Sequence, residues 1–120
     1  LIGKVVQVSE SRSTVELVTS GNYQVGFTVL GTSAVGTAQG TGSPDVLRGG
    51  NIDFTAVVES GQIAVTSGTE GSIFPRGLPI GTVTAVRTDA AARETTVGIE
   101  LLADTTNLTY ADVVVYAPPP

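Results

Sequence analysis

Hydrophobic and polar residues alternate along most of the chain, with a period of two rather than the 3.6 of a helix. The clearest case is NYQVGFTVL at residues 22–30, where large apolar side chains occupy every second position and polar or small residues lie between them. Because successive strand residues point to opposite faces, this pattern predicts a half-buried strand. The same criterion predicts strands at residues 2–8, 13–18, 33–40, 44–49, 51–58, 62–68, 79–89, 94–102 and 113–116.

The predicted strands recur about every ten residues, with Gly-rich or Ser-rich turns between them. This spacing is typical of an all-β barrel or β-sandwich. DAAAR at 89–93 is too short for a stable helix and is predicted to be a hairpin tip. Asp104 is placed to cap a single helical turn. The terminal prolines at 118–120 cannot donate backbone hydrogen bonds, so they are predicted to begin a Pro-rich tail.

A Gly/Pro-rich loop, TSGTEGSIFPRGLPIGTV at 66–83, joins two of these strands. Its glycines are candidates for positive φ or close backbone approach, and its prolines suit turns and strand edges. The predicted structural turn residues are Gly68, Gly71, Pro75, Gly77, Pro79 and Gly81.

Several side chains in this loop are too hydrophobic for free solvation, so some are expected to plug a barrel end and others to meet a partner protein. A stiff connector between two β units is the simpler interpretation, and partner contact is the alternative. The candidate partner-binding residues are Ile73, Phe74, Arg76 and Leu78, followed by Tyr23 and Phe27. For Tyr23 and Phe27, lining the first barrel is the favoured interpretation.

The composition excludes several kinds of chemistry. The 120 residues contain neither cysteine nor histidine, so no Ser-His-Asp or Cys-His triad forms within the chain, and the usual zinc and copper ligands are missing. The net charge is −5 and the six basic residues are scattered, which argues against nucleic acid and against an anionic membrane surface as direct partners. The carboxylates lie in no distinctive motif, and we expect them to be solvated rather than to form a glycosidase pair. The prediction is therefore a non-enzyme without cofactor, catalytic residue or metal site.

The run AVTSGTEGSIFPRGLPIGTVTAV resembles the signature of the rod shape-determining protein MreC family, T-S-G followed by F-P-x-G-x-P-[VI]-G-x-V. The matching residues are Thr66, Ser67, Gly68, Phe74, Pro75, Gly77, Pro79, Ile80, Gly81 and Val83. LIGKVVQVSESRSTVELVTS and VGIELLADTTNLTYADVVVY are similar to the family's opening and closing segments. The likeness covers nearly the whole chain, although Ser72 resembles an insertion and the closing motif lacks its usual proline.

The resemblance implies two small six-stranded β-barrels or β-sandwich-like subdomains. On that basis we expect the first subdomain at 1–65, short of the family's upstream hairpin, and the second at 66–117, entered through the Gly/Pro-rich loop. Without that hairpin, the first barrel would have an open edge.

The resemblance also implies a non-enzymatic, extracytoplasmic scaffold of the bacterial cell-elongation machinery, on the periplasmic face of the cell membrane. In the family a single membrane helix and a coiled coil precede the barrels, so contact with the membrane is expected only through that N-terminal anchor. The implied partners are a class B penicillin-binding transpeptidase, the integral membrane protein MreD and further copies of the chain itself.

Two other classes of protein remain open from the residues alone. One is a secreted β-sandwich binding module for carbohydrate or protein, although the chain has three tyrosines and no tryptophan to stack on a sugar. The other is a β subunit of a surface or viral assembly, for which no residues match in order.

Overall fold

The computed structural model describes residues 1–21, 23–43, 45–53, 57–68, 74–89 and 91–103, together with residues 111 and 113. Within these ranges the regular structure consists of β-strands and one 3₁₀ turn, so the all-β prediction is confirmed. In chain order the elements are β1 (Gly3–Val8), β2 (Ser13–Leu17), η1 (Val18–Ser20), β3 (Gln24–Val29), β4 (Val35–Gly40), β5 (Val46–Asp53), β6 (Ile63–Thr66), β7 (Pro79–Asp89) and β8 (Glu94–Leu101). Apart from Val113, the strand predicted at 113–116 lies outside the described residues, as does the turn predicted at Asp104.

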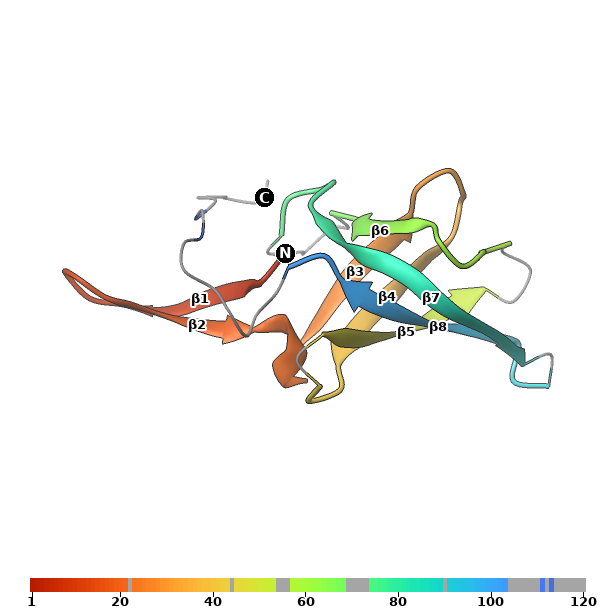
Figure 1. The fold of residues 1–120 in the computed structure, drawn as a ribbon, viewed down its shortest axis with the longest axis horizontal. Coiled ribbons are helices and arrows are strands. Elements are labelled where there is room, and N and C mark those ends of the chain that lie inside the picture. The colour runs from red at the N-terminus through yellow and green to blue at the C-terminus, as the bar shows by residue number, and fades with distance from the viewer. Residues whose placement is uncertain are drawn as a thin grey trace.

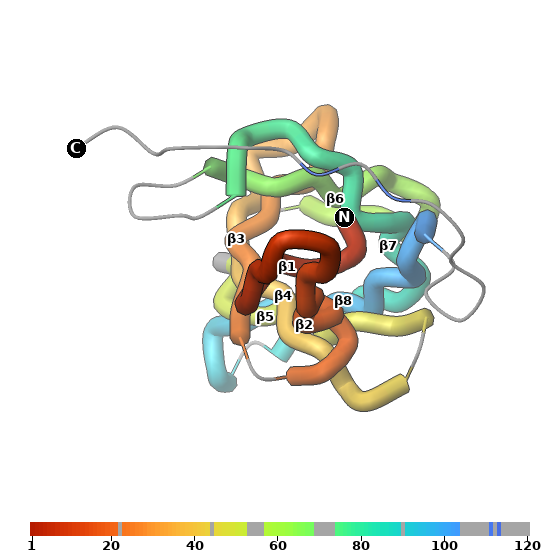
Figure 2. Tube along the Cα trace, turned by 90° about the vertical axis from the view of Figure 1, so that its left-hand side faces the viewer, coloured from red at the N-terminus to blue at the C-terminus, as the bar shows by residue number. Residues whose placement is uncertain are grey.

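Six strands close a barrel in the order β3-β4-β5-β8-β7-β6, and every neighbouring pair is antiparallel (Figure 1). Closure comes from β6, which pairs with β3 on one side and β7 on the other. The hairpin of β1 and β2 forms a separate two-stranded sheet that projects from the barrel (Figures 1 and 2).

The expected division at residue 65 is wrong for the described residues, because the barrel takes strands from both sides of it. Strands β3 to β6 start before that point, whereas β7 and β8 follow it. The resemblance implied two subdomains with the boundary at the Gly/Pro-rich loop, but a loop rich in turn residues also serves to connect neighbouring strands of one sheet. The loop therefore connects β6 to its own neighbour β7 rather than separating two barrels.

Strand β5 replaces the two strands predicted at 44–49 and 51–58. The pairing of β5 with β8 shifts between Gly49 and Ile52, and Asn51 in this stretch has φ 59°. A bulge of this kind adds one residue to a strand and bends it without ending it. The Gly-Gly-Asn sequence that looked like a turn is thus a bulge inside one strand.

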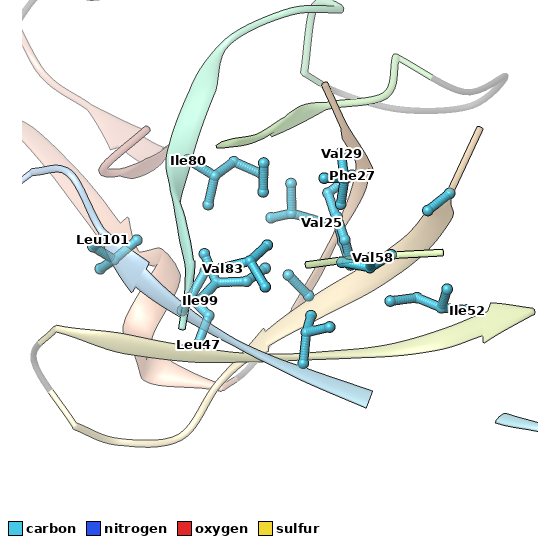
Figure 3. Close-up of a cluster of buried hydrophobic side chains, with 14 of the residues drawn as sticks. Val25, Phe27, Val29, Leu47, Ile52, Val58, Ile80, Val83, Ile99 and Leu101 are labelled. Carbon is cyan, nitrogen blue, oxygen red and sulfur yellow. The ribbon is translucent and has the colours of Figure 1, made fainter. Parts of the chain in front are cut away.

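The core fills the inside of the barrel (Figure 3). Alternation predicted the inward face of β3 correctly, since Val25, Phe27 and Val29 are at most 1% exposed. Strand β8 supplies Val97, Ile99 and Leu101 in the same way. Among the described residues, Phe27 is the largest fully buried side chain. Space for its ring comes from glycines on the facing strands, because a Cβ at Gly49 would lie 2.9 Å from the Phe27 ring.

The tip between β7 and β8 is the turn predicted at 89–93. The Asp89 carboxylate accepts hydrogen bonds from the backbone N–H groups of Ala91 and Ala92, at 3.0 and 3.2 Å. An aspartate that accepts from the backbone two residues further on is a common way to initiate a turn. Arg93 completes the tip with φ 54°.

Candidate functional site

The Gly/Pro-rich loop is fastened to the end of β6 by Thr66. The fully buried Thr66 hydroxyl donates to the Pro75 carbonyl at 2.6 Å and accepts from the Leu78 N–H at 2.8 Å. The Thr66 backbone bonds to Leu78 and Gly77, at 2.8 and 2.9 Å. One residue therefore makes four hydrogen bonds that fold the second half of the loop back onto the barrel. Gly71 and Ile73, predicted as a turn residue and a partner contact, lie outside the described residues.

Phe74 is buried at the barrel end and is 7% exposed. It belongs to the hydrophobic core, and its ring stacks on Tyr23 with a centroid separation of 6.2 Å and an interplanar angle of 25°. Burial in the core leaves little of Phe74 exposed for the partner contact predicted for it, and Phe27 is fully buried, as expected from the favoured interpretation that it lines the barrel. The loop inserts its phenylalanine as a plug because burial of an aromatic ring stabilises the fold strongly.

Of the predicted partner contacts that the structure describes in the loop, Arg76 is exposed and Leu78 is half-buried. The two prolines differ in the same way, since Pro75 is half-buried and Pro79 is exposed at the first position of β7. Proline has no backbone N–H, but at the first residue of a strand the hydrogen bonding between strands tolerates the loss of this donor. In the part of the loop that the structure describes, the exposed residues are therefore Arg76, Gly77 and Pro79.

The loop glycines serve two structural purposes. Gly68 and Gly77 have φ of 61° and 89°, in the left-handed region that disfavours residues with a Cβ. Gly81 has no positive φ, but a Cβ there would run into the backbone carbonyl of Glu100 on β8. Gly81 is therefore required for close approach of two strands.

Replacing Gly77 by alanine is expected to lower the free energy of unfolding by about 1 kcal/mol. No heavy atom lies within 4 Å of the position a Cβ would take, so the cost comes from backbone conformation and not from a clash. Urea denaturation measures the loss. Gly77→Asn is the matched control, because asparagine tolerates positive φ better than alanine and should cost less. Equal stability of the alanine variant and the native chain would contradict this role.

Tyr23 connects the β1–β2 hairpin to the barrel. Its hydroxyl donates to the Glu16 carbonyl on β2 at 2.9 Å, while its ring packs against Phe74 at the barrel end. The Lys4 ammonium on β1 lies 4.4 Å from the ring centroid, in the geometry of a cation–π contact. Tyr23 is thus half-buried between the hairpin and Phe74, at the barrel end.

Burial, together with the charge of Glu16, raises the pKa of the Tyr23 hydroxyl from 10.0 to about 12. The folded chain holds this proton more tightly than the unfolded chain. The contribution of the protonated Tyr23 hydroxyl to the free energy of unfolding is therefore fully present below pH 10 and is lost as the pH rises through 12.

Tyr23→Phe is expected to cost about 1 kcal/mol at pH 9 through the lost hydrogen bond. The difference from the native chain should shrink at pH 11.5. The rest of the sequence is common to both proteins, so the difference between their unfolding free energies at the two pH values isolates the contribution of Tyr23. A difference independent of pH would contradict the raised pKa.

A second feature, which the sequence did not reveal, is a polar hollow of about 420 Å³ on the outside of the barrel. Its side chains come from β3, β4 and the residue after it, β5 and the start of β8. They are Gln24, Thr37, Gln39, Thr41, Arg48, Asn51 and Glu94. These residues lie up to 70 positions apart in the chain and share no motif, so the closure of the barrel alone brings them together.

No group of three or more carboxylate, histidine or cysteine side chains able to hold a metal ion occurs in the part of the chain that the structure describes. The same residues contain no helix long and apolar enough to cross a membrane.

Comparison with known proteins identifies the family. The model of the barrel core of the rod shape-determining protein MreC matches residues 1–115. The chain belongs to the MreC family. The cell shape-determining protein MreC of Haemophilus influenzae is 33% identical to it over 91 residues, which are 76% of this chain and 26% of that protein.

Solved MreC structures share the fold. The crystal structure of MreC from Pseudomonas aeruginosa superposes with a TM-score of 0.80 at 30% identity, covering 87% of this chain and 66% of that one. MreC of Listeria monocytogenes gives a TM-score of 0.79 at 33% identity, covering 88% and 52%. The chain thus spans about a quarter of the Haemophilus relative and corresponds to the barrel core of a family of cell shape-determining proteins.

Proposed function

We propose that this MreC segment is a non-enzymatic, extracytoplasmic scaffold that binds and positions peptidoglycan-synthesis proteins during cell elongation. The observation that carries the proposal is the family match over residues 1–115. The absence of histidine and cysteine from the sequence supports a role without nucleophilic or metal chemistry. In the full-length protein, a single membrane helix upstream of the barrel would hold it at the periplasmic face.

The proposed partners are a class B penicillin-binding transpeptidase, MreD and further copies of the chain. The second half of the loop, which Thr66 fastens to the barrel, is a suitable contact surface, because a segment that is already held in place loses little conformational entropy when it binds. Arg76 supplies such an exposed, charged side chain on the loop fastened by Thr66.

Sedimentation velocity of the chain with the soluble domain of the cognate transpeptidase tests the proposal. We expect a saturable complex that Arg76→Glu weakens. Arg87→Glu is the matched control, since Arg87 is also exposed but lies on the distant part of β7. Phe74→Asp is unsuitable for this purpose, because it would place a charge in the core. If neither the transpeptidase nor MreD in detergent forms a complex with the folded chain, the scaffold role of this segment is wrong.

A further inference from the structure

The polar hollow on the outside of the barrel has a lining in which Gly50 leaves room beside Glu94. Gly40 and Gly50 both contribute to its surface, and a Cβ at Gly50 would lie 3.3 Å from Glu94 Oε1. The bulge in β5 turns Asn51 toward this space through its φ of 59°. Bulges commonly redirect a side chain beside a binding site.

Hydrogen bonds hold several side chains of the hollow in place. The Asn51 N–H donates to Glu94 Oε1 at 3.0 Å, and the Asn51 side-chain amide donates to the Thr37 hydroxyl at 2.8 Å. The Gln39 amide donates to the Gly21 carbonyl at 2.9 Å. These bonds fix the orientation of the Asn51, Gln39 and Thr37 side chains. They do not use the side-chain carbonyl oxygens of Asn51 and Gln39 or the hydroxyl proton of Thr37, which can therefore bind a ligand.

Arg48 and Glu94 place opposite charges in different parts of the hollow. Within the described ranges, the Arg48 guanidinium and the Gln24 amide have no hydrogen-bond or ion-pair partner. Glu94 reaches the backbone at Asn51, three positions along β5 from Arg48. No ion pair joins Arg48 to Glu94 within the described residues, and in the β5–β8 ladder Arg48 lies opposite Gly98, four positions along β8 from Glu94. Four strand steps span about 13 Å, so one ligand can lie between the two charges.

We propose that this hollow binds an extended peptide segment carrying an acidic and a basic side chain two residues apart. In an extended chain, residues i and i+2 lie on one side about 7 Å apart, so their flexible side chains can reach both charges. The acidic group pairs with the Arg48 guanidinium, whose fork geometry matches a carboxylate, and the basic group pairs with Glu94. Peptide amides between them meet the Gln39, Asn51 and Thr37 side chains.

The lining favours a peptide over a saccharide. It includes no aromatic ring on which a sugar face could stack, and its separated opposite charges match a dipolar ligand rather than a neutral one. The inference concerns the chemistry of the ligand and does not depend on which synthesis protein the scaffold positions.

The test is an NMR titration of the isotopically labelled chain with acetyl-Ala-Glu-Ala-Lys-Ala-amide at low ionic strength. We expect amide shift changes confined to the lining strands and a dissociation constant of about 1 mM, as for a few exposed polar contacts. Peptides with Gln-Ala-Gln, Glu-Ala-Glu or Lys-Ala-Lys at the same positions should bind more weakly, and added salt should weaken the Glu-Ala-Lys peptide.

Variants locate the contact. Arg48→Gln and Glu94→Gln should each weaken binding about threefold, the size expected for one exposed ion pair. Glu94→Gln keeps an acceptor for the Asn51 N–H, and the NMR spectra verify that each variant is folded. Arg87→Gln removes an equal charge outside the hollow. It should leave the peptide affinity unchanged apart from the small effect of the altered net charge. The proposal would be overturned if Arg48→Gln and Arg87→Gln lost equal peptide affinity, or if the Gln-Ala-Gln peptide bound as strongly as the Glu-Ala-Lys peptide. It would also be overturned if the Glu-Ala-Lys peptide caused no shift changes, or if an N-acetylglucosamine trimer bound in its place.

Discussion

Replacing Phe27 by alanine is expected to lower the free energy of unfolding by about 3–5 kcal/mol. Phe27 is fully buried in the middle of the barrel, and its ring is surrounded by the strands that close it. Removing the ring loses its burial free energy and leaves a cavity that a closed barrel can collapse only in part. Since a domain of this size is typically stable by about 5–15 kcal/mol, the variant should be close to unfolding at elevated temperature.

A double-mutant cycle with Gly49 makes this prediction specific. A Cβ at Gly49 would lie 2.9 Å from the Phe27 ring and 2.7 Å from a Val97 methyl group, so Gly49→Ala should destabilise the native chain. In a Phe27→Leu background the clash with the ring is removed, and the same change should cost less by about 1 kcal/mol, a coupling typical of residues in contact. Chemical denaturation of the four proteins measures the coupling. Additive losses would show that the glycine does not make room for the ring.

Replacing Thr66 by valine is expected to cost about 2–4 kcal/mol. The Thr66 hydroxyl accepts a hydrogen bond from the Leu78 N–H and donates one to the Pro75 carbonyl. Valine matches the shape of threonine but can make neither of these bonds. Each buried polar group left without a partner costs about 1–3 kcal/mol.

Thr66→Ser is the matched control, because it keeps the hydroxyl and loses only a methyl group. Hydrogen exchange should show faster opening at Gly77 and Leu78 in the valine variant and native-like protection in the serine variant. If both variants lose stability equally, packing of the methyl group rather than the two hydrogen bonds holds the loop.

The strands were predictable because alternation is a local property. Residues 22–30 alternate strictly, and β3 buries the side that the pattern assigned to the core. The predictions at 79–89 and 94–102 coincide with β7 and β8 to within a residue. The prediction failed at 44–58, since Gly and Asn at 49–51 signal a turn locally. Only pairing with β8 shows that they form a bulge.

The candidate site was predicted only in part. Turn chemistry identified Gly68 and Gly77, because positive φ is a backbone requirement that glycine meets without regard to its neighbours. Burial of Phe74 could not be read in the same way, since an aromatic residue in a loop is equally suited to a core and to an interface. Its position was decided by Tyr23 and by Thr66, which holds the loop against the barrel.

The sequence by itself determined the all-β class, the strand positions, the exclusion of histidine and cysteine chemistry, and the family through its ordered Gly/Pro motif. Only the tertiary structure decided that strands on both sides of residue 65 close one barrel, that Phe74 is a plug, and that Arg48 and Glu94 share a hollow. The physical reason is range. Alternation and turn preference depend on a few neighbouring residues, whereas strand partners and burial depend on residues brought together from distant parts of the chain.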